Sequence, residues 1–165
     1  MHISQRGLRR LADFDYSQAG AYAFRLAVTG RREVLSRIED AAVHLLPVGE
    51  IVQRHWNDLP KRYQVVLDEL VIMPDHVHGI LWIDDLKSGP RARPTLSDIM
   101  RGFKTFTAIE INNLLGTRGR SFWQRNYYEH IIRHGADLRS AREYMRENPV
   151  RWELKHKDEP TYLTK

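Results

Sequence analysis

The sequence contains no cysteine among its 165 residues. This absence excludes disulfide bonds, thiolate metal sites and cysteine nucleophiles, so any bound metal ion must use histidine, carboxylate or amide ligands. Long apolar runs are also missing, because no stretch reaches the roughly eighteen residues that a membrane-spanning helix needs, and the N-terminus lacks the apolar segment of a signal peptide. We therefore expect a cytoplasmic protein that does not contact a membrane.

Linker-like sequence is scarce as well. Only residues 87–94 combine glycine and proline with basic residues, and this stretch is too short to separate domains. The sequence shows no internal repeat and no low-complexity tract. Because a chain of 165 residues is long enough to bury its own core, we expect a single domain over residues 1–165.

Basic residues are in moderate excess. The 26 lysines and arginines outnumber 21 acidic residues, which gives a net charge of +5 and a pI near 9.6. Such an excess suits a polyanionic partner such as nucleic acid, although many proteins without such a partner share it. The charge alone favours nucleic-acid binding only modestly.

Apolar periodicity predicts the order of helices and strands. A two-residue period is typical of a half-buried strand, and spacings of three and four residues are typical of an amphipathic helix. Thr95 and Asp98 form a capping pattern at the start of one helix, and Asn148 with Pro149 is expected to end the last helix. The predicted elements are strand 22–28, a small hairpin within 31–46, helix 48–59, strands 65–73 and 76–84 around a Pro74-Asp75 turn, helix 95–115, a strand from Phe122-Trp123 and 128–132, and helix 136–147.

Without the hairpin, the order is strand, helix, strand, strand, helix, strand, followed by one more helix. This is the split βαββαβ order of a ferredoxin-like α+β fold, in which an antiparallel sheet carries helices on one face. The other face is left free for a ligand, and the additional C-terminal helix carries candidate functional residues. Because this fold serves many unrelated tasks, the functional argument must rest on particular side chains.

Two segments carry those side chains. His76 and His78 stand one residue apart in a predicted strand, so their rings are expected on the same face of the sheet. Tyr144 and Asn148 are four residues apart on a predicted helix and therefore project from one side of it. Two imidazole nitrogens and an amide oxygen can converge on a metal ion, with a phenol beside them.

These segments resemble a known family. The runs Val71 to Ile80, Phe122 to Arg133 and Glu143 to Pro149 are similar, in this order and spacing, to the single-tyrosine transposases of the insertion-sequence type, which carry a His-hydrophobe-His (HUH) motif. Asn148 favours the branch of REP-associated tyrosine transposases, since insertion-sequence relatives have glutamine at that position. The resemblance extends from about Tyr22 to Trp152.

The resemblance implies a role for each matching residue. His76, His78 and Asn148 match the ligands of Mg²⁺ or Mn²⁺, and Tyr144 matches the nucleophile that forms a covalent 5′-phosphotyrosine. The implied partner is single-stranded DNA that carries a small hairpin, at repeat or transposon-end sequences. The implied activity is metal-dependent nicking and rejoining of a DNA strand.

The residue types support this chemistry on their own. A tyrosine phenol has an ordinary pKa near ~10 and is a poor nucleophile at neutral pH without help. A divalent metal ion can polarise the scissile phosphate, orient it for in-line attack and stabilise the developing charge. Nitrogen and oxygen ligands suit manganese or magnesium in use, although zinc, nickel and copper bind such ligands more tightly.

Basic and aromatic residues outside these segments are candidate DNA contacts. Arginine and lysine side chains contact phosphates, and aromatic rings stack on unpaired bases. A charged helix face is as often merely solvated, so both interpretations stay open. The candidates are Arg91, Arg93, Arg101, Lys104, Trp123, Arg125 and Tyr127, with Trp152 as a further ring and Arg6, Arg9 and Arg10 in loose correspondence to the family's N-terminal contacts.

The same residues also have simpler, structural interpretations. A histidine pair, a helix tyrosine or an asparagine before proline is, taken singly, more often structural, and their joint occurrence is what favours a site. Tyr127 and Tyr128 are rival nucleophiles, but neither has an amide four residues on. Glu129, His130 and His134 suggest a second metal cluster, yet strand alternation sends Glu129 and His130 to opposite faces.

Two other functions fit the sequence. A replication initiator or relaxase shares the histidine pair but carries long additional regions, and a catalytically silent DNA-binding module would keep the same fold. The sequence also leaves open whether the terminal helix packs on its own sheet or on that of a partner subunit. The first arrangement allows a monomer, and the second requires a homodimer.

Overall fold

The computed structural model describes residues 20–83 and 94–157. Its elements are β1 (Gly20–Ala27), the 3-10 turn η1 (Thr29–Arg31), β2 (Ser36–Glu39), β3 (Ala42–Leu45), α1 (Pro47–Asn57), α2 (Leu59–Arg62), β4 (Val65–Ile72), β5 (His76–Ile83), α3 (Leu96–Leu115), β6 (Tyr128–Ile132) and α4 (Gly135–Lys157). Among these, no helix combines the length and apolar character that crossing a membrane requires.

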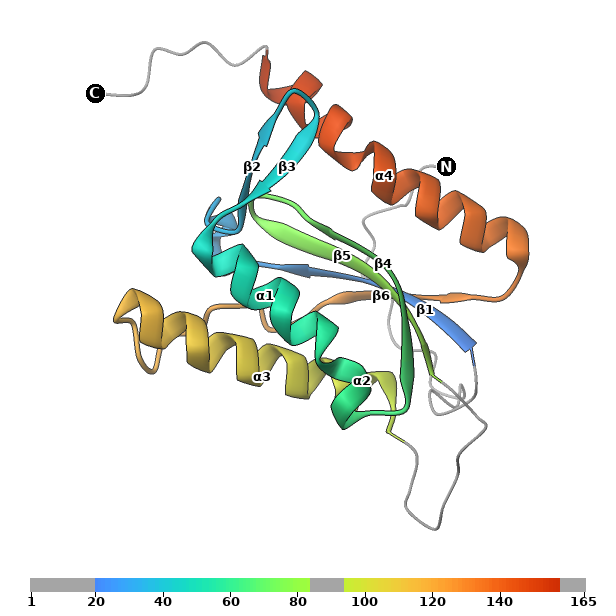
Figure 1. Cartoon of the computed structure of the whole chain (residues 1–165), viewed down its shortest axis with the longest axis horizontal. Helices are drawn as coiled ribbons and strands as arrows, with labels where there is room; N and C mark the ends of the chain where they lie inside the picture. The colour runs from blue at the N-terminus through green and yellow to red at the C-terminus, as the bar shows by residue number, and fades with distance from the viewer. Residues whose placement is uncertain (1–19, 84–93, 158–165) are drawn as a thin grey trace.

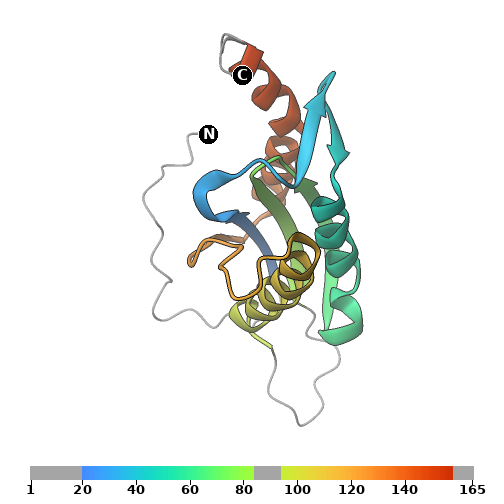
Figure 2. The ribbon, with the colours of Figure 1, turned by 90° about the vertical axis from the view of Figure 1, so that its left-hand side faces the viewer.

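The main sheet has the order β4-β5-β1-β6, and every neighbouring pair is antiparallel. Helices α1 and α3 cover one face, whereas α4 crosses the other (Figure 1). The view turned by 90° shows the same layers, with the β2–β3 hairpin extending beside α4 (Figure 2). The predicted ferredoxin-like α+β fold and the additional terminal helix are confirmed, and so is the predicted hairpin.

Strand alternation divides the apolar side chains between two cores. Tyr22, Phe24 and Leu26 of β1 point into the larger core under α1 and α3. The smaller core under α4 contains Ala21, Ile80, Ile132 and Met145. Helix α4 is therefore attached to the sheet by far less apolar packing than the other helical layer.

Glycine at position 79 is required by the larger core. A Cβ added there would lie 2.5 Å from the ring of Phe24 and 3.2 Å from that of Trp56. Gly79 directly follows His78 in β5, so the strand that carries the histidine pair is packed tightly from its far side.

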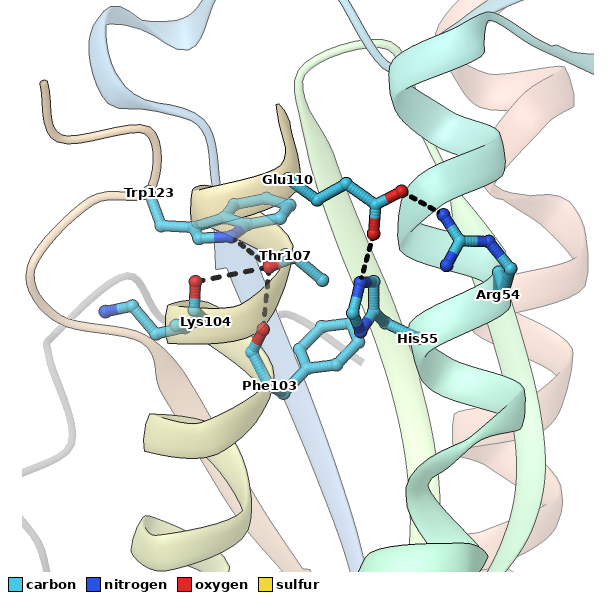
Figure 3. Close-up of polar contacts among 7 residues, drawn as sticks. All are labelled: Arg54, His55, Phe103, Lys104, Thr107, Glu110 and Trp123. Atoms are coloured by element: carbon cyan, nitrogen blue, oxygen red, sulfur yellow. Dashed lines mark hydrogen bonds and ion pairs between the residues drawn. The ribbon is translucent and has the colours of Figure 1, made fainter. Parts of the chain in front are cut away.

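Polar contacts join α1 to α3 and α3 to the segment before β6. Glu110 accepts hydrogen bonds from Arg54 and from His55 Nε2, the latter at 2.8 Å, as Figure 3 shows. The indole nitrogen of Trp123 donates to Thr107 Oγ1 at 2.8 Å. These contacts make the α1–α3 layer a connected support for the sheet.

The last helix is longer than predicted. Asn148 and Pro149 were expected to end it, but α4 continues to Lys157 with Pro149 inside. A proline inside a helix removes one backbone hydrogen bond and typically costs ~3 kcal/mol. Burial of Pro149 and the contacts that Trp152 makes beyond it offset that cost, and these tertiary contacts were not visible as a local pattern.

Two other helix boundaries bear on the prediction. Helix α3 begins and ends as expected, with a capping box of Thr95 and Asp98 and with Gly116 in the left-handed conformation at its end. Pro60 was expected to end helical structure, but it lies in the first turn of the short helix α2. The first turn tolerates proline because its N–H groups have no helical partner.

Candidate active site

The histidine pair lies on β5, on the face that α4 covers. The centroids of the His76 and His78 rings are 4.9 Å apart, with the rings nearly perpendicular. Val77, between them, points into the opposite core. Since β5 has hydrogen-bonded neighbours on both sides, the backbone holds the two rings in place, and the predicted sharing of one face is confirmed.

Asp75 is a residue of this site that sequence reasoning missed. Nδ1 of His76 donates a hydrogen bond to Asp75 Oδ1 at 2.5 Å, and Arg31 Nε lies 2.8 Å from Asp75 Oδ2. This contact uses Nδ1 and leaves Nε2 as the atom of His76 that could bind a metal ion, an arrangement in which a carboxylate orients the imidazole. A carboxylate adjacent in sequence to the first histidine was the available signal.

Burial controls the charge of the histidine pair. Burial lowers the pKa of His78 well below its ordinary value, and it lowers the pKa of His76 despite the opposing hydrogen bond to Asp75. Burial would raise the pKa of Asp75, but the hydrogen bond from His76 and the nearby cations together hold it below its ordinary value. Two neutral imidazoles backed by a carboxylate are the form of histidine that binds a metal ion.

Helix α4 brings Tyr144 to the histidines. The Tyr144 ring centroid lies 5.6 Å from that of His78, edge to face. One turn later, Asn148 donates from Nδ2 to the Tyr144 carbonyl at 3.1 Å, which leaves its Oδ1 as the atom that can bind a metal ion. Both halves of the site come from one chain, so a second subunit is not needed to complete it.

The side of α4 that carries Tyr144 and Asn148 continues beyond Pro149. The Trp152 ring lies 6.1 Å from the His76 ring and stacks on His156, with centroids 4.3 Å apart. Together with Tyr144 and Asn148, these residues recur every four positions. Trp152 was expected only as a stacking ring and His156 was missed, because proline was interpreted as the end of the helix.

Asp68 of β4 anchors α4 in this position. It accepts hydrogen bonds from Arg142 Nε at 2.8 Å and from Trp82 Nε1 at 3.0 Å, and the side chain of Asp68 is only 7% exposed. A second ion pair joins Arg146 to Glu69, but the Arg146 side chain is 68% exposed. The buried anchor therefore fixes the register of Tyr144 over the sheet.

Replacing Asp68 with alanine should destabilise the docking of α4. We expect a loss of roughly 2 kcal/mol in the free energy of unfolding, because hydrogen bonds to a buried charged group are lost, whereas Glu69→Ala should cost at most about 1 kcal/mol. Urea unfolding at neutral pH measures both variants. Equal effects of the two substitutions would contradict the role of Asp68 as the anchor of α4.

The ion pair between Asp68 and Arg142 also predicts that the stability of the protein depends on pH. The hydrogen bond from Arg142 lowers the pKa of Asp68, despite burial. A carboxylate whose folded-state pKa is depressed stabilises the fold above its unfolded pKa of about 3.9 and loses this contribution as the pH falls through the folded value. The stability difference between wild type and Asp68→Ala should therefore be full at neutral pH and shrink below about pH 4.

The predicted DNA contacts gather elsewhere. One open pocket lies between the first half of α3 and the segment before β6. Its lining contains four of these candidates, Arg101, Lys104, Arg125 and Tyr127, together with Ser97 and Thr105. Lys104 donates to the carbonyls of Gln124 and Arg125 at 2.8 Å each and so holds the pocket wall. Burial lowers the pKa of Lys104. The pocket belongs to the α1–α3 side of the sheet, opposite the histidines.

Other candidates are placed differently. Trp123 is 3% exposed and its indole N–H is used by Thr107, so it is a core residue and its burial argues against stacking on DNA. The Phe122-Trp123 part of the expected strand is reduced to an isolated bridge between Trp123 and Val28, whereas residues 128–132 form β6 as predicted. The arginines at positions 6, 9, 10, 91 and 93 lie outside the described residues.

Tyr127 and Tyr128 lie on opposite sides of the sheet. Tyr127 packs against the larger core and lines the basic pocket. Tyr128 pairs with Arg25 of β1, and the pKa of Tyr128 is raised, first by burial and then by the charge of Tyr144. Of the two rival tyrosines, Tyr128 is therefore the one near the histidine site.

No group of three or more histidine, aspartate or glutamate side chains within residues 20–83 and 94–157 is arranged to hold a metal ion. The alternative cluster of Glu129, His130 and His134, against which strand alternation already argued, therefore has no support in this part of the chain. The site on β5 and α4 instead offers two imidazoles and an amide.

The chain is similar to known proteins over most of its length. Residues 28–148 match the family model described as "Transposase IS200 like", a range that spans the histidine pair, Tyr144 and Asn148. An uncharacterized protein of Haemophilus influenzae is 31% identical over 170 residues, which cover 92% of each chain.

Two solved structures share the fold. A REP-associated tyrosine transposase bound to a REP hairpin matches with a TM-score of 0.63 at 20% identity, over 84% of this chain and 72% of that one. A proposed transposase of Deinococcus radiodurans R1 matches with a TM-score of 0.51 at 18% identity, over 86% of this chain and 98% of that one.

Proposed function

The chain belongs to the family of IS200-like transposases, and from this membership we propose that it nicks and rejoins single-stranded DNA beside a small hairpin, with Tyr144 as the nucleophile. Family membership supports the coarser statement of a transposase-type, DNA-binding function. The single observation that carries the finer proposal is the Tyr144 ring beside the His78 ring, 5.6 Å between centroids, with Asn148 one helical turn away.

The donor set fits a divalent metal ion. Burial favours the neutral forms of His76 and His78, Asp75 orients the first of them, and Asn148 contributes an amide oxygen. In our proposal these three side chains hold Mg²⁺ or Mn²⁺, which when bound would polarise the scissile phosphate. The described residues offer this site without any thiolate, as the sequence requires.

In the proposed reaction Tyr144 acts as the nucleophile. Its phenol loses a proton and the oxygen attacks the phosphorus, the bond from phosphorus to the 3′ oxygen breaks, and that oxygen takes up a proton to become a 3′-hydroxyl. The products are a 5′-phosphotyrosine and a free 3′ end. Attack by a 3′-hydroxyl reverses the step and rejoins DNA without an external energy source, because the phosphoester bond is kept.

The proposed partner is a DNA hairpin. A solved relative of the same fold is bound to a REP hairpin, and this chain presents a basic pocket that includes Arg101 and Arg125 with Tyr127. In our proposal the pocket contacts phosphates of the hairpin stem, with Arg91 and Arg93 as further contacts outside the described residues. Phosphate contacts give affinity and register rather than base recognition.

Replacing Arg101 and Arg125 together with glutamine should weaken hairpin binding roughly 10-fold at moderate salt and reduce the slope of log affinity against log salt by about two. Both arginines are exposed, so the fold should be unaffected. Fluorescence anisotropy with a labelled hairpin at several salt concentrations measures this. The matched control is the double substitution Arg118→Gln with Arg120→Gln, in the loop after the C-terminal end of α3. An equal loss of affinity in the control would place the hairpin elsewhere.

The experiment that tests the proposed function is a covalent-adduct assay with single-stranded DNA from the flanks of its own gene and Mn²⁺. DNA labelled on the 3′ side of the cut should migrate with the protein on a denaturing gel, and DNA labelled on the 5′ side should not. Tight hairpin binding without any adduct would instead indicate a catalytically silent DNA-binding module.

A further inference from the structure

Arg25 is a charged residue on a strand face that is otherwise built from alanine. In β1, Phe24 and Leu26 point into the larger core, so the alternate positions face α4. These positions hold alanine at residues 21, 23 and 27 and arginine only at residue 25. A large cation at this place is therefore not part of the apolar packing beneath α4.

Arg25 lies in the same cross-strand row as His78 and Tyr128. The register of β1 pairs it with His78 of β5 on one side and with Tyr128 of β6 on the other. Its charge adds to burial in lowering the pKa values of His76 and His78, and the charge of Tyr144 acts in turn on Arg25. The guanidinium therefore lies near the histidine pair and near Tyr144.

One nitrogen of the partly buried Arg25 guanidinium lacks a hydrogen-bond partner among the described residues. This nitrogen, Nε, is itself buried. Burial, followed by the charge of Arg31, lowers the pKa of Arg25, while Tyr144 and Asp75 oppose that shift. A buried donor without a partner costs free energy of folding, and an anionic ligand bound at this face would give the donor a partner.

We infer that Arg25 contacts the non-bridging oxygens of the scissile phosphate and is a catalytic residue of this site. The inference rests on the proposed function, and it adds a substrate contact from a third element, β1, to the histidines of β5 and the tyrosine of α4. The planar guanidinium can donate two parallel hydrogen bonds to a phosphate, which a lysine cannot reproduce. Negative charge on these oxygens increases as Tyr144 attacks, so the contact strengthens in the transition state.

Binding tests this assignment independently of cleavage. In a Tyr144→Phe background, extending a hairpin by the single strand that spans the cut should raise its affinity, and adding Arg25→Met should remove most of that gain, roughly 10-fold. Binding of the hairpin alone should not change. If Arg25→Met leaves the gain from the extension intact, Arg25 does not contact this phosphate, whether or not the chain cuts DNA.

Cleavage kinetics give the second test. With a normal phosphate, we expect Arg25→Met to slow adduct formation at least about 100-fold and Arg25→Lys to slow it by about 10-fold. With an uncharged methylphosphonate at the cut, wild type and Arg25→Met should differ by less than about 10-fold, since the charge that the arginine neutralises is gone. The exposed Arg37→Met is the matched control and should behave as wild type.

Unfolding measurements exclude a merely structural role. Arg25→Met should be at least as stable as wild type, because the substitution removes a partly buried cation whose Nε has no hydrogen-bond partner among the described residues. A variant that is strongly destabilised and equally slow on both phosphate types would overturn the inference. Failure of wild type to form any adduct, with the binding gain still dependent on Arg25, would contradict the proposed function alone.

Discussion

Replacement of Tyr144 with phenylalanine should abolish the covalent protein–DNA adduct, with a loss of more than about 10³-fold, since removing a nucleophile removes the reaction path itself. The substitution deletes one oxygen and keeps the ring that lies against His78 and under the Arg151 guanidinium. Hairpin affinity and the unfolding midpoint should therefore equal those of wild type. A denaturing gel with labelled DNA measures the adduct, and anisotropy measures the affinity.

Tyr128→Phe is the matched control for that experiment. Tyr128 lies on the same face of the sheet, but burial raises the pKa of its phenol, which makes it a poorer source of phenolate at neutral pH. We expect this variant to keep the adduct. An adduct that survives in Tyr144→Phe and disappears in Tyr128→Phe would move the nucleophile from α4 to β6.

Replacement of His78 with alanine should have the second-largest effect. We expect cleavage to fall at least about 100-fold and the affinity for Mn²⁺ to fall at least about 10-fold, because one of three proposed metal ligands is lost. Isothermal titration with Mn²⁺ measures binding without reference to cleavage. Since the sequence contains no cysteine, treatment of the protein with a thiol-alkylating reagent should leave both quantities unchanged.

Two comparison variants sharpen this prediction. Asp75→Asn keeps the size of the side chain that orients His76 and should reduce metal affinity or activity by about 10-fold to 100-fold, the range typical of a residue that supports a ligand. The exposed His134, at the start of α4, offers a control histidine, and His134→Ala should match wild type. Equal effects of His78→Ala and His134→Ala would contradict the assignment of the metal site to β5.

The sequence predicted the two halves of the site because each half is local. A period of two places His76 and His78 on one face of a strand, and a spacing of four places Tyr144 and Asn148 on one side of a helix. The order of elements was equally accessible, because apolar periodicity separates strands from helices and caps bound α3. None of these arguments needed a contact between residues distant in the chain.

The features that were missed depend on distant contacts. Arg25 appears in sequence as a polar residue on the outer face of a half-buried strand, and nothing local shows that a helix more than a hundred residues later covers that face. The attachment of α4 to its own sheet depends on Asp68 and Arg142, which are 74 positions apart. The extent of α4 was underestimated because tertiary contacts outweigh the local cost of Pro149.

The consecutive tyrosines at the start of β6 bear on the number of nucleotides that would separate the DNA hairpin from the cut. Tyr127 lines the basic pocket on one side of the sheet, and Tyr128 faces the histidine site on the other. β6 is an edge strand of the main sheet. On the proposed function, single-stranded DNA that leaves a DNA hairpin bound in the basic pocket would have to pass around this edge of the sheet to reach Tyr144. The thickness of the protein at β6, rather than recognition of each base, would then set the number of nucleotides between the hairpin and the cut.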